Sequence, residues 1–422
     1  MILDDIPQVV YAPAKVFKKI IENPKYLGAV LILVLFIGIQ IGFEYVQFSK
    51  TYVENTSPAV NNLPSFLNAT SWQSNSNVTL SNNYNDFYNY SVDVVGLSTV
   101  YSLFGNSSLE MDAANANNVI AALGNTSNVD CSAPSGFLNL SMTIKLVDPS
   151  VAPQSATLTL YSLSDTSSFQ YDLTSSLSNT ADIGLWNNLT IPLGQNAQGW
   201  TSSGSPSWSN ITALQLTFNY PTSSNIAIRI GAFFFRGQYE TPIQFNGTGI
   251  ALLCLETFSL QFIFAWFVLT GVIYLFFKGL KSNITWKPLF IAVAFALFVM
   301  VIRAAVNLVA AATLPTVYYP FDLSLGVIFP NTFGAITYPL LTAGSSLSAQ
   351  SVAILNSINS ATAGFREALF AMFAVSYIWL GALGTVIIGI LNPQFSTMKR
   401  VLIAAVSVGV TILLLLLLVA VV

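Results

Sequence analysis

The chain of 422 residues is 53% hydrophobic and only 8% charged, with a formal net charge of −3 at pH 7. Soluble domains average about a quarter charged residues, so this composition favours an integral membrane protein. The chain has no histidine and only two cysteines, Cys131 and Cys254, in different environments. A Ser-His-Asp site and a His-ligated metal are therefore excluded. We predict no enzymatic activity, no cofactor, no metal site, no disulfide framework and no nucleic-acid partner.

Residues 1–25 are predicted to form a cytoplasmic amphipathic segment. Pro13 suits the start of a short helix and Pro24 suits its end. Lysines flank one apolar face, which favours a helix that lies on the cytoplasmic membrane surface. A plain basic flank to the first span is the alternative, and both put the N-terminus inside. The apolar face consists of Val16, Phe17, Ile20 and Ile21.

Five long apolar stretches organise the membrane part. A helix needs roughly 20 apolar residues to cross a bilayer, and each stretch is long enough. Short basic loops are typical of the cytoplasmic side. The loop after the second stretch carries Lys278, Lys281 and Lys287, and the loop after the fourth carries Lys399 and Arg400. We predict an α-helical bundle of five transmembrane helices, at 26–48, 250–277, 288–314, 365–391 and 401–422.

Residues 49–249 have the composition of an extracellular domain, rich in Asn, Ser and Thr. In 138–146, apolar and polar residues alternate, which indicates a strand with one buried face. The alternation recurs at 158–160, 214–220 and 226–230, whereas 49–90 indicates a loop-rich lead-in. We therefore predict an all-β, antiparallel jelly-roll sandwich of roughly eight strands, inserted between the first and second spans.

Residues 315–363 are predicted to return to the outside. Prolines and a glycine break the apolar run 316–344, which favours interfacial or re-entrant pieces over a clean span. Residues 345–365 are predicted to form an amphipathic helix that leads back to the fourth span.

Part of the β domain resembles the galactose-binding-like jelly rolls. The resemblance rests on Trp186 followed by 191–193, on Trp208 followed by the strand 211–218, and on the strand 228–235. It implies the jelly-roll fold and a carbohydrate-binding-like domain.

One departure from that family affects the expected site. Members usually carry an acid where Arg229 or Gly231 stands here, so the family's metal or sugar site is not carried over. Trp186 and Trp208 are predicted to be core residues. Trp200, in a Gly/Ser-rich turn, is the candidate ligand platform.

The membrane part resembles the Yip family of Ypt/Rab-interacting multi-span proteins, which has many archaeal and bacterial relatives. The resemblance implies a five-helix membrane domain with a cytoplasmic N-terminus. In eukaryotes it implies GTPase binding and vesicle traffic. We do not transfer that role, because the eukaryotic signature between spans is not recognisable and the large β domain departs from the usual short loop. The resemblance rests on Pro13, Val16, Phe17, Ile20, Asn23 and Pro24 ahead of five spans.

Two further sets of side chains are candidate sites. The first is an intramembrane polar cluster, in which Glu256 and Arg303 lie at similar depth and either fix helix packing or line a substrate or proton pathway; its members are Glu256, Arg303, Asn307 and Glu367. The second is a set of possible glycosylation sites in N-x-S/T sequons, at Asn55, Asn68, Asn77, Asn89, Asn106, Asn125, Asn139, Asn188, Asn210 and Asn246.

Three functions remain open on this evidence. The first is a non-enzymatic, Yip-like protein of the plasma membrane that displays an extracellular binding module. The second is a transporter or transporter subunit with the β domain as receptor, and the third is a membrane-organising or trafficking factor. The expected partners are the lipid bilayer, a glycan or cell-surface protein at the β domain, and other membrane proteins.

Overall fold

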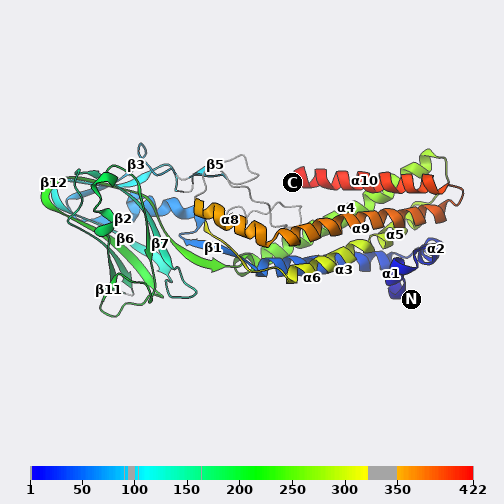
Figure 1. Cartoon of the computed structure of the whole chain (residues 1–422), viewed down its shortest axis with the longest axis horizontal. Coiled ribbons are helices and arrows are strands. Elements are labelled where there is room, and N and C mark those ends of the chain that lie inside the picture. The colour runs from blue at the N-terminus through cyan, green and yellow to red at the C-terminus, as the bar shows by residue number, and fades with distance from the viewer. Residues whose placement is uncertain are drawn as a thin grey trace.

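A β-sandwich and a bundle of long helices lie end to end along the molecule (Figure 1). This computed structural model describes residues 2–89, 91–93, 100–102, 104–162, 164–321 and 349–421. The N-terminus lies at the end of the bundle farthest from the sandwich (Figure 1).

Five helical segments in the described residues are long and apolar enough to cross a membrane. Each overlaps one of the five predicted stretches. They are Tyr26–Ser49 (α3), Asn246–Gly279 within α4 (Pro242–Gly279), Trp286–Ala312 (α5, Trp286–Ala296, with α6, Phe298–Ala312), Ala363–Leu391 (α9) and Thr397–Leu417 within α10 (Thr397–Val421).

Two short helices, α1 (Ile2–Tyr11) and α2 (Pro13–Glu22), precede the first span. The amphipathic helix predicted between Pro13 and Pro24 is present as α2. Its apolar face, however, packs against α5 and α9 and is buried, so it cannot lie on lipid as predicted. At this end of the bundle, other helices cover the apolar face of α2. Protein therefore shields the face from water, as lipid acyl chains would have done. Lys19 of α2 forms an ion pair of 2.7 Å with Asp5 of α1.

The third span is divided at Leu297 into α5 and α6, whereas one continuous helix was predicted. Every side chain of α5 from Leu289 to Ala296 is buried, because α5 packs against α2, α3, α4, α6 and α9. A helix that is apolar on all sides suits such a central position. Trp266 of α4 fixes α5 by donating its indole N–H to the Phe290 carbonyl oxygen, at 2.6 Å.

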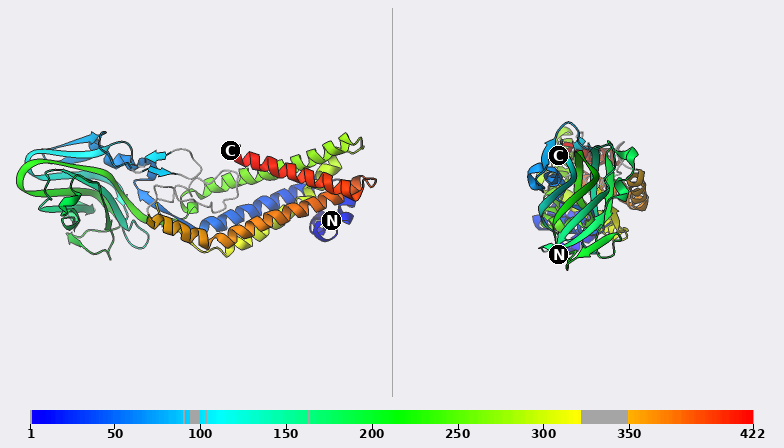
Figure 2. Two further views of the ribbon diagram at one scale, coloured as in Figure 1. Left: turned by 45° about the horizontal axis from the view of Figure 1, so that its top comes forward. Right: turned by 90° about the vertical axis from the view of Figure 1, so that its left-hand side faces the viewer.

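The sandwich is built on a long antiparallel ribbon of β6 (Ser108–Val129) and β12 (Ile211–Glu240). Residues 211–219 of β12 lie between β6 and β8, whereas 227–236 pair with β7 on the side away from β6. The register shifts between 219 and 226, where the green β12 curves at the far end of the molecule (Figure 2). One half of the ribbon carries β2 (Trp72–Ser74), β8 (Ser155–Ser162), β9 (Ser164–Asp172) and β11 (Trp200–Ser203), and the other carries β3 (Val78–Asn83), β7 (Asn139–Asp148) and β10 (Asn187–Pro192).

The alternation of apolar and polar residues in the sequence correctly predicted which strand residues form the core. Leu140, Ile144, Leu158, Leu214 and Ile228 are fully buried between the layers. The described strands form one 11-stranded sheet plus the pair β4 (Ser91–Asp93) and β5 (Val100–Ser102), against the eight strands predicted. The difference arises partly at 49–90, which contributes β1 (Thr51–Ser57), β2 and β3 instead of only a loop-rich lead-in. Those strands are short and polar, so alternation does not reveal them.

Three strands connect the sandwich to the bundle. β1 (Thr51–Ser57) follows α3, β12 runs into α4, and β13 (Val317–Tyr319) follows α6. β1 pairs antiparallel with the end of β12 and parallel with β13. We call this three-stranded connection the junction.

Polar side chains fix the junction. Glu54 of β1 is 3% exposed and accepts hydrogen bonds from the Arg236 guanidinium at 2.8 and 2.9 Å and from the Phe321 N–H at 2.6 Å. Lys50 donates to the carbonyl oxygens of Ala312 and Leu314, both at 2.6 Å, where α6 ends. Cations stabilise a helix C-terminus in this way.

The helix predicted over 345–365 is present in part as α8 (Ala349–Ala361), which leads into α9. The interfacial or re-entrant pieces predicted within 316–344 lie outside the described residues from 322 onward.

Candidate functional site: a polar hollow on the sandwich

The predicted side chains Glu256 and Arg303 are not brought together. Arg303 is buried in α6, and its guanidinium carbon lies 5.7 Å from the ring centre of Phe373 and 5.8 Å from that of Tyr377, both on α9. Glu256 is exposed on α4. The cause is helix rotation, because Cys254 faces the interior and a position two residues further on points to the opposite face.

The other two residues of the predicted intramembrane cluster, Asn307 and Glu367, also lie apart, one within the bundle and one on its surface. Asn307 lies one turn from Arg303, and its side-chain oxygen has no hydrogen-bond partner among the described residues. Glu367 is exposed near the start of α9. Its neighbour Arg366 donates to the Thr362 hydroxyl at 2.6 Å. Arg303 and Asn307 therefore lie within the bundle, and Glu256 and Glu367 on its surface.

A second intramembrane polar face, on α3, was not predicted. Gln40, Glu44 and Gln47 are 4%, 1% and 1% exposed, and their spacing places them on one face of the helix. Glu44 lies near the sandwich-side end of α3, and it is nevertheless buried by the surrounding protein. The i, i+4, i+7 spacing of polar residues in an apolar stretch was the available signal.

Trp200 is half-buried in a cluster of aromatic rings. Its indole N–H donates to the Pro192 carbonyl oxygen at 2.7 Å, and its ring centre lies 5.1 Å from that of Tyr171 and 5.2 Å from that of Trp208. Trp208 itself stacks on Phe169 at 3.9 Å. Trp200 is thus partly exposed and packed against neighbouring rings, and its role as a ligand platform stays a prediction.

A charged network surrounds Arg229. This is one of the two positions where members of the galactose-binding-like family usually carry an acid. Arg229 forms ion pairs with Asp86 and with Glu110, and Lys145 pairs with Asp86 at 2.8 Å. Burial alone would raise the pKa of Asp86, but hydrogen bonds from Lys145 and Arg229 outweigh it and hold the pKa below its ordinary value. This network attaches residues 84–89 to the sheet.

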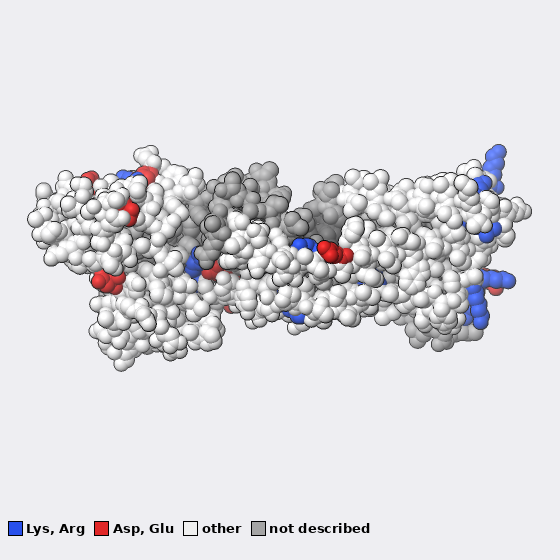
Figure 3. All heavy atoms as spheres, viewed as in Figure 1, with Lys and Arg blue, Asp and Glu red and all other residues white. Residues whose placement is uncertain are grey.

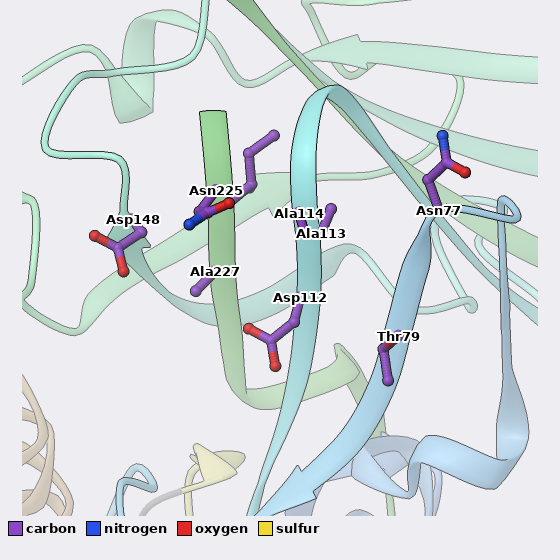
Figure 4. Close-up of a pocket in the computed structure, with 9 residues that line it drawn as sticks. Asn77, Thr79, Asp112, Ala113, Ala114, Asp148, Asn225 and Ala227 are labelled. Carbon is purple, nitrogen blue, oxygen red and sulfur yellow. The ribbon is translucent and has the colours of Figure 1, made fainter. Parts of the chain in front are cut away.

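Beside this network lies a polar hollow of about 470 Å³. Thr79, Asp112, Ala227 and Asp148 form one row across β3, β6, β12 and β7. In Figure 4, Asp148 and Asn225 lie on one side of Ala113 and Ala114, and Asn77 and Thr79 on the other. We call this feature the hollow; its lining is Asn77, Thr79, Asp112, Ala113, Ala114, Asp148, Asn225, Ile226 and Ala227.

The chemistry of the hollow is that of a hydrogen-bonding surface with a small apolar floor. Two carboxylates, two carboxamides and a hydroxyl surround alanine side chains, which leave room for a ring. Burial raises the pKa of Asp112 above its ordinary value, and the charges of Glu110 and Asp148 raise it further. None of these residues was predicted as a ligand site, because they come from four strands far apart in the sequence.

Among the sequon asparagines whose side chains the structure describes, six are exposed, namely Asn68, Asn77, Asn89, Asn106, Asn188 and Asn246. Asn55 is half-buried and donates to Glu240 at 2.9 Å. Asn77 and Thr79 belong to one sequon and both line the hollow, so a glycan attached at Asn77 would occupy it.

No family model and no curated protein matches the sequence. Among solved structures, the chain is similar to a family 11 carbohydrate-binding module from Clostridium thermocellum in complex with a mixed-linked tetrasaccharide, at 13% identity over 39% of this chain and 88% of that chain, with a TM-score of 0.23. It is also similar to an exo-beta-agarase, at 9% identity over 41% of this chain and 24% of that chain, with a TM-score of 0.26. Because these TM-scores are low, we derive the function from the hollow.

Proposed function

We propose that this protein is a membrane-anchored binding protein whose extracellular sandwich holds a glycan in the hollow. The observation that carries the proposal is the lining of the hollow itself. Carboxylates and carboxamides are the partners that sugar hydroxyls require, and the alanine floor suits the C–H face of a sugar ring. Asp112 and Asp148 make the site acidic, so a neutral or amino sugar fits better than an acidic one.

The distribution of charge supports an outward-facing sandwich. Lys and Arg side chains gather at the end of the bundle farthest from the sandwich (Figure 3). The segments at that end hold nine basic and three acidic residues, against six basic and fifteen acidic in the rest of the chain. Short basic segments stay in the cytoplasm. The basic residues are Lys15, Lys18, Lys19, Lys25, Lys278, Lys281, Lys287, Lys399 and Arg400.

Aromatic side chains at both ends of the bundle support the same placement. At the basic end, Tyr26 lies under Lys287 at 5.4 Å, and Tyr274 packs on Trp286. At the sandwich end, Tyr52 and Tyr239 both pack against Tyr318 of the junction. Tyrosine and tryptophan are enriched at both membrane–water interfaces. The 24 residues of α3 between these ends span about 36 Å, enough for a bilayer core of about 30 Å.

Burial in the bundle favours an anchor over a transporter. A transport path would need polar groups from one end of the bundle to the other. The buried polar side chains of α3 and α6 lie toward the sandwich, whereas the basic end holds α5, whose buried residues from Leu289 to Ala296 are all apolar. The Yip-like membrane domain is part of the same proposal, and the five candidate spans behind two short N-terminal helices support it.

The test is a glycan array probed with the full chain in nanodiscs. We expect binding of neutral oligosaccharides, reduced at least tenfold in Asp112→Asn and in Asp148→Asn, because each loses a charge-assisted acceptor. Asp172→Asn, an exposed carboxylate on β9, is the matched control and should bind as the wild type does. Equal binding by all three variants would remove the hollow from the proposal.

A further inference from the structure

Asn77 is the sequon asparagine among the residues that line the hollow. Its sequon consists of Asn77, Val78 and Thr79, and Thr79 lines the hollow as well. Both Asn77 and Thr79 are exposed, so an enzyme that modifies sequons has access to them. The other asparagine of the hollow, Asn225, is followed two residues later by Ala227 and therefore belongs to no sequon.

The geometry of β3 places this sequon on the same sheet face as the acids of the hollow. Val78 pairs with Ala113 of β6, and both side chains are buried in the core. Side chains alternate along a strand, so Asn77 and Thr79 lie on the outer face. On that face Thr79 is paired with Asp112. A glycan attached to Asn77 therefore begins at the β3 edge of the hollow.

The hollow extends from this edge across the sheet. It crosses β6 and β12 and ends at β7, which carries Asp148. Adjacent strands lie about 4.8 Å apart, so three strand spacings place β7 about 14 Å from β3. Asn77 and Asp148 lie on opposite sides of the strand that carries Asp112 (Figure 4). A short sugar chain that starts at Asn77 and follows the sheet passes Asp112 before it reaches Asp148.

We propose that Asn77 carries an N-linked glycan that lies back across the sheet and fills the hollow, so that the chain's own glycan controls the access of other glycans to the site. This inference rests on the proposed function, in which the hollow binds a glycan. The hydroxyl groups of the attached sugars meet the carboxylates of Asp112 and Asp148, and their C–H faces meet the alanine floor.

The attachment is a group transfer from an activated sugar. The side-chain amide nitrogen of Asn77 forms a bond to the anomeric carbon of a lipid-linked sugar phosphate or diphosphate. The bond from that carbon to the phosphate oxygen breaks, and the phosphate leaves with the bonding electron pair. One amide proton passes to a base of the external transferase, and no group is oxidised or reduced.

Covalent attachment makes the glycan an effective competitor for the hollow. A short flexible tether gives a bound group an effective concentration of the order of 1 mM. With a Kd of about 0.1 mM for such sugars, the attached glycan fills about nine-tenths of the hollows, and the apparent affinity for a free oligosaccharide falls about tenfold. The attached glycan thus sets a threshold concentration for external ligands.

The experiment compares glycosylated and glycan-free forms of the full chain in nanodiscs. Mass spectrometry of glycopeptides, on protein purified from its own membrane, should show that Asn77 is modified. The probe for binding is the glycan that an amidase releases from this protein, titrated by calorimetry. Wild-type chain produced without N-glycans should bind the probe at least tenfold more tightly than the glycosylated chain.

Two variants of the glycosylated chain should show the same gain in affinity. Asn77→Gln keeps a carboxamide at the hollow, and Thr79→Val keeps Asn77 and a side chain that suits a strand, yet each destroys the sequon. Asn106→Gln is the matched control, because Asn106 is an exposed sequon asparagine outside the hollow, and it should bind as the glycosylated wild type does. The glycan-free wild type has no substitution, so it decides the question if a variant does not fold.

The outcomes separate this inference from the proposed function. An unmodified Asn77 in the native protein overturns the inference. Equal affinities of the glycosylated and glycan-free chains also overturn it, and the proposed function then stands if Asp112→Asn weakens binding to the glycan-free chain. If the glycan-free chain binds neither the probe nor any sugar on the array, the proposed function fails and this inference fails with it.

Discussion

Asp86 and Asp112 lie in the same layer of the sandwich, yet their pKa values shift in opposite directions. Asp86 is held by Lys145 and Arg229, which lower its pKa, whereas Asp112 is partly buried near other acids, which raises its pKa. The first aspartate therefore works as part of the scaffold. The second takes part in none of the ion pairs among the described residues and lines the hollow proposed to bind a glycan.

The lowered pKa of Asp86 predicts an acid-dependent loss of stability. Its ion pairs stabilise the fold above the unfolded-state pKa, near 4, and this contribution is lost as the pH falls through the lower folded-state pKa. Asp86→Asn should reduce the free energy of unfolding by about 1–2 kcal/mol at pH 7 and by almost nothing at pH 2. Denaturant unfolding followed by tryptophan fluorescence measures both values. An equal loss at the two pH values would mean that the ion pairs do not contribute.

Asp112 should behave in the opposite sense. Its raised pKa means that the folded state binds the proton more tightly, so its charge destabilises the fold as the pH rises from about 4 through the folded-state pKa. Asp112→Asn should therefore be slightly more stable than the wild type at pH 7, by less than about 1 kcal/mol, and equal to it at pH 2. The same unfolding measurements check this, and a less stable variant at pH 7 would contradict it.

At the scale of elements, α2 packs within the helix bundle, and the junction connects the bundle to the sandwich. If α2 packs on α5 and α9, Phe17→Ala should cost about 3 kcal/mol of bundle stability, because Phe17 is fully buried. Lys18→Ala on the exposed side of α2 is the control and should change little. A helix resting on lipid would instead lose membrane contact without destabilising the bundle, and thermal unfolding in detergent separates the two.

The junction should hold the sandwich at a fixed orientation to the bundle. Glu54→Gln removes a buried acceptor of the Arg236 guanidinium and should cost about 2–3 kcal/mol. It should also broaden the distance between spin labels at Ser202→Cys in the sandwich and Ser396→Cys in the α9–α10 loop. Glu240→Gln, which changes a contact with Asn55 at the same junction, is the matched control and should leave that distance narrow. A narrow distribution in Glu54→Gln would show that other contacts set the orientation.

Sequence patterns predicted which faces are buried more reliably than they predicted the partners of those faces. Alternation over 138–146 identified the core side of β7, and the apolar face around Phe17 identified the buried side of α2. Alternation cannot show that β6 and β12 form one bent ribbon, since strand pairing depends on residues about a hundred positions apart. For the same reason the hollow could not be predicted, because Thr79, Asp112 and Asp148 become neighbours only through that pairing.

At the scale of the whole molecule, the account requires the sandwich and the basic end of the bundle to lie on opposite sides of one membrane. The basic loops and the aromatic residues at both ends of the bundle agree on this placement, and glycan binding by the hollow depends on it. Both native cysteines are buried, so the wild type should react little with a polar maleimide and serves as the blank.

Cysteine accessibility in intact cells tests the placement most directly. Ser202→Cys, exposed on β11 of the sandwich, should be labelled by a membrane-impermeant maleimide before the cells are opened. Ser396→Cys, exposed between α9 and α10, should be labelled only after permeabilisation. Labelling of Ser396→Cys in intact cells, with Ser202→Cys protected until they are opened, would reverse the orientation and contradict the display of an extracellular binding module.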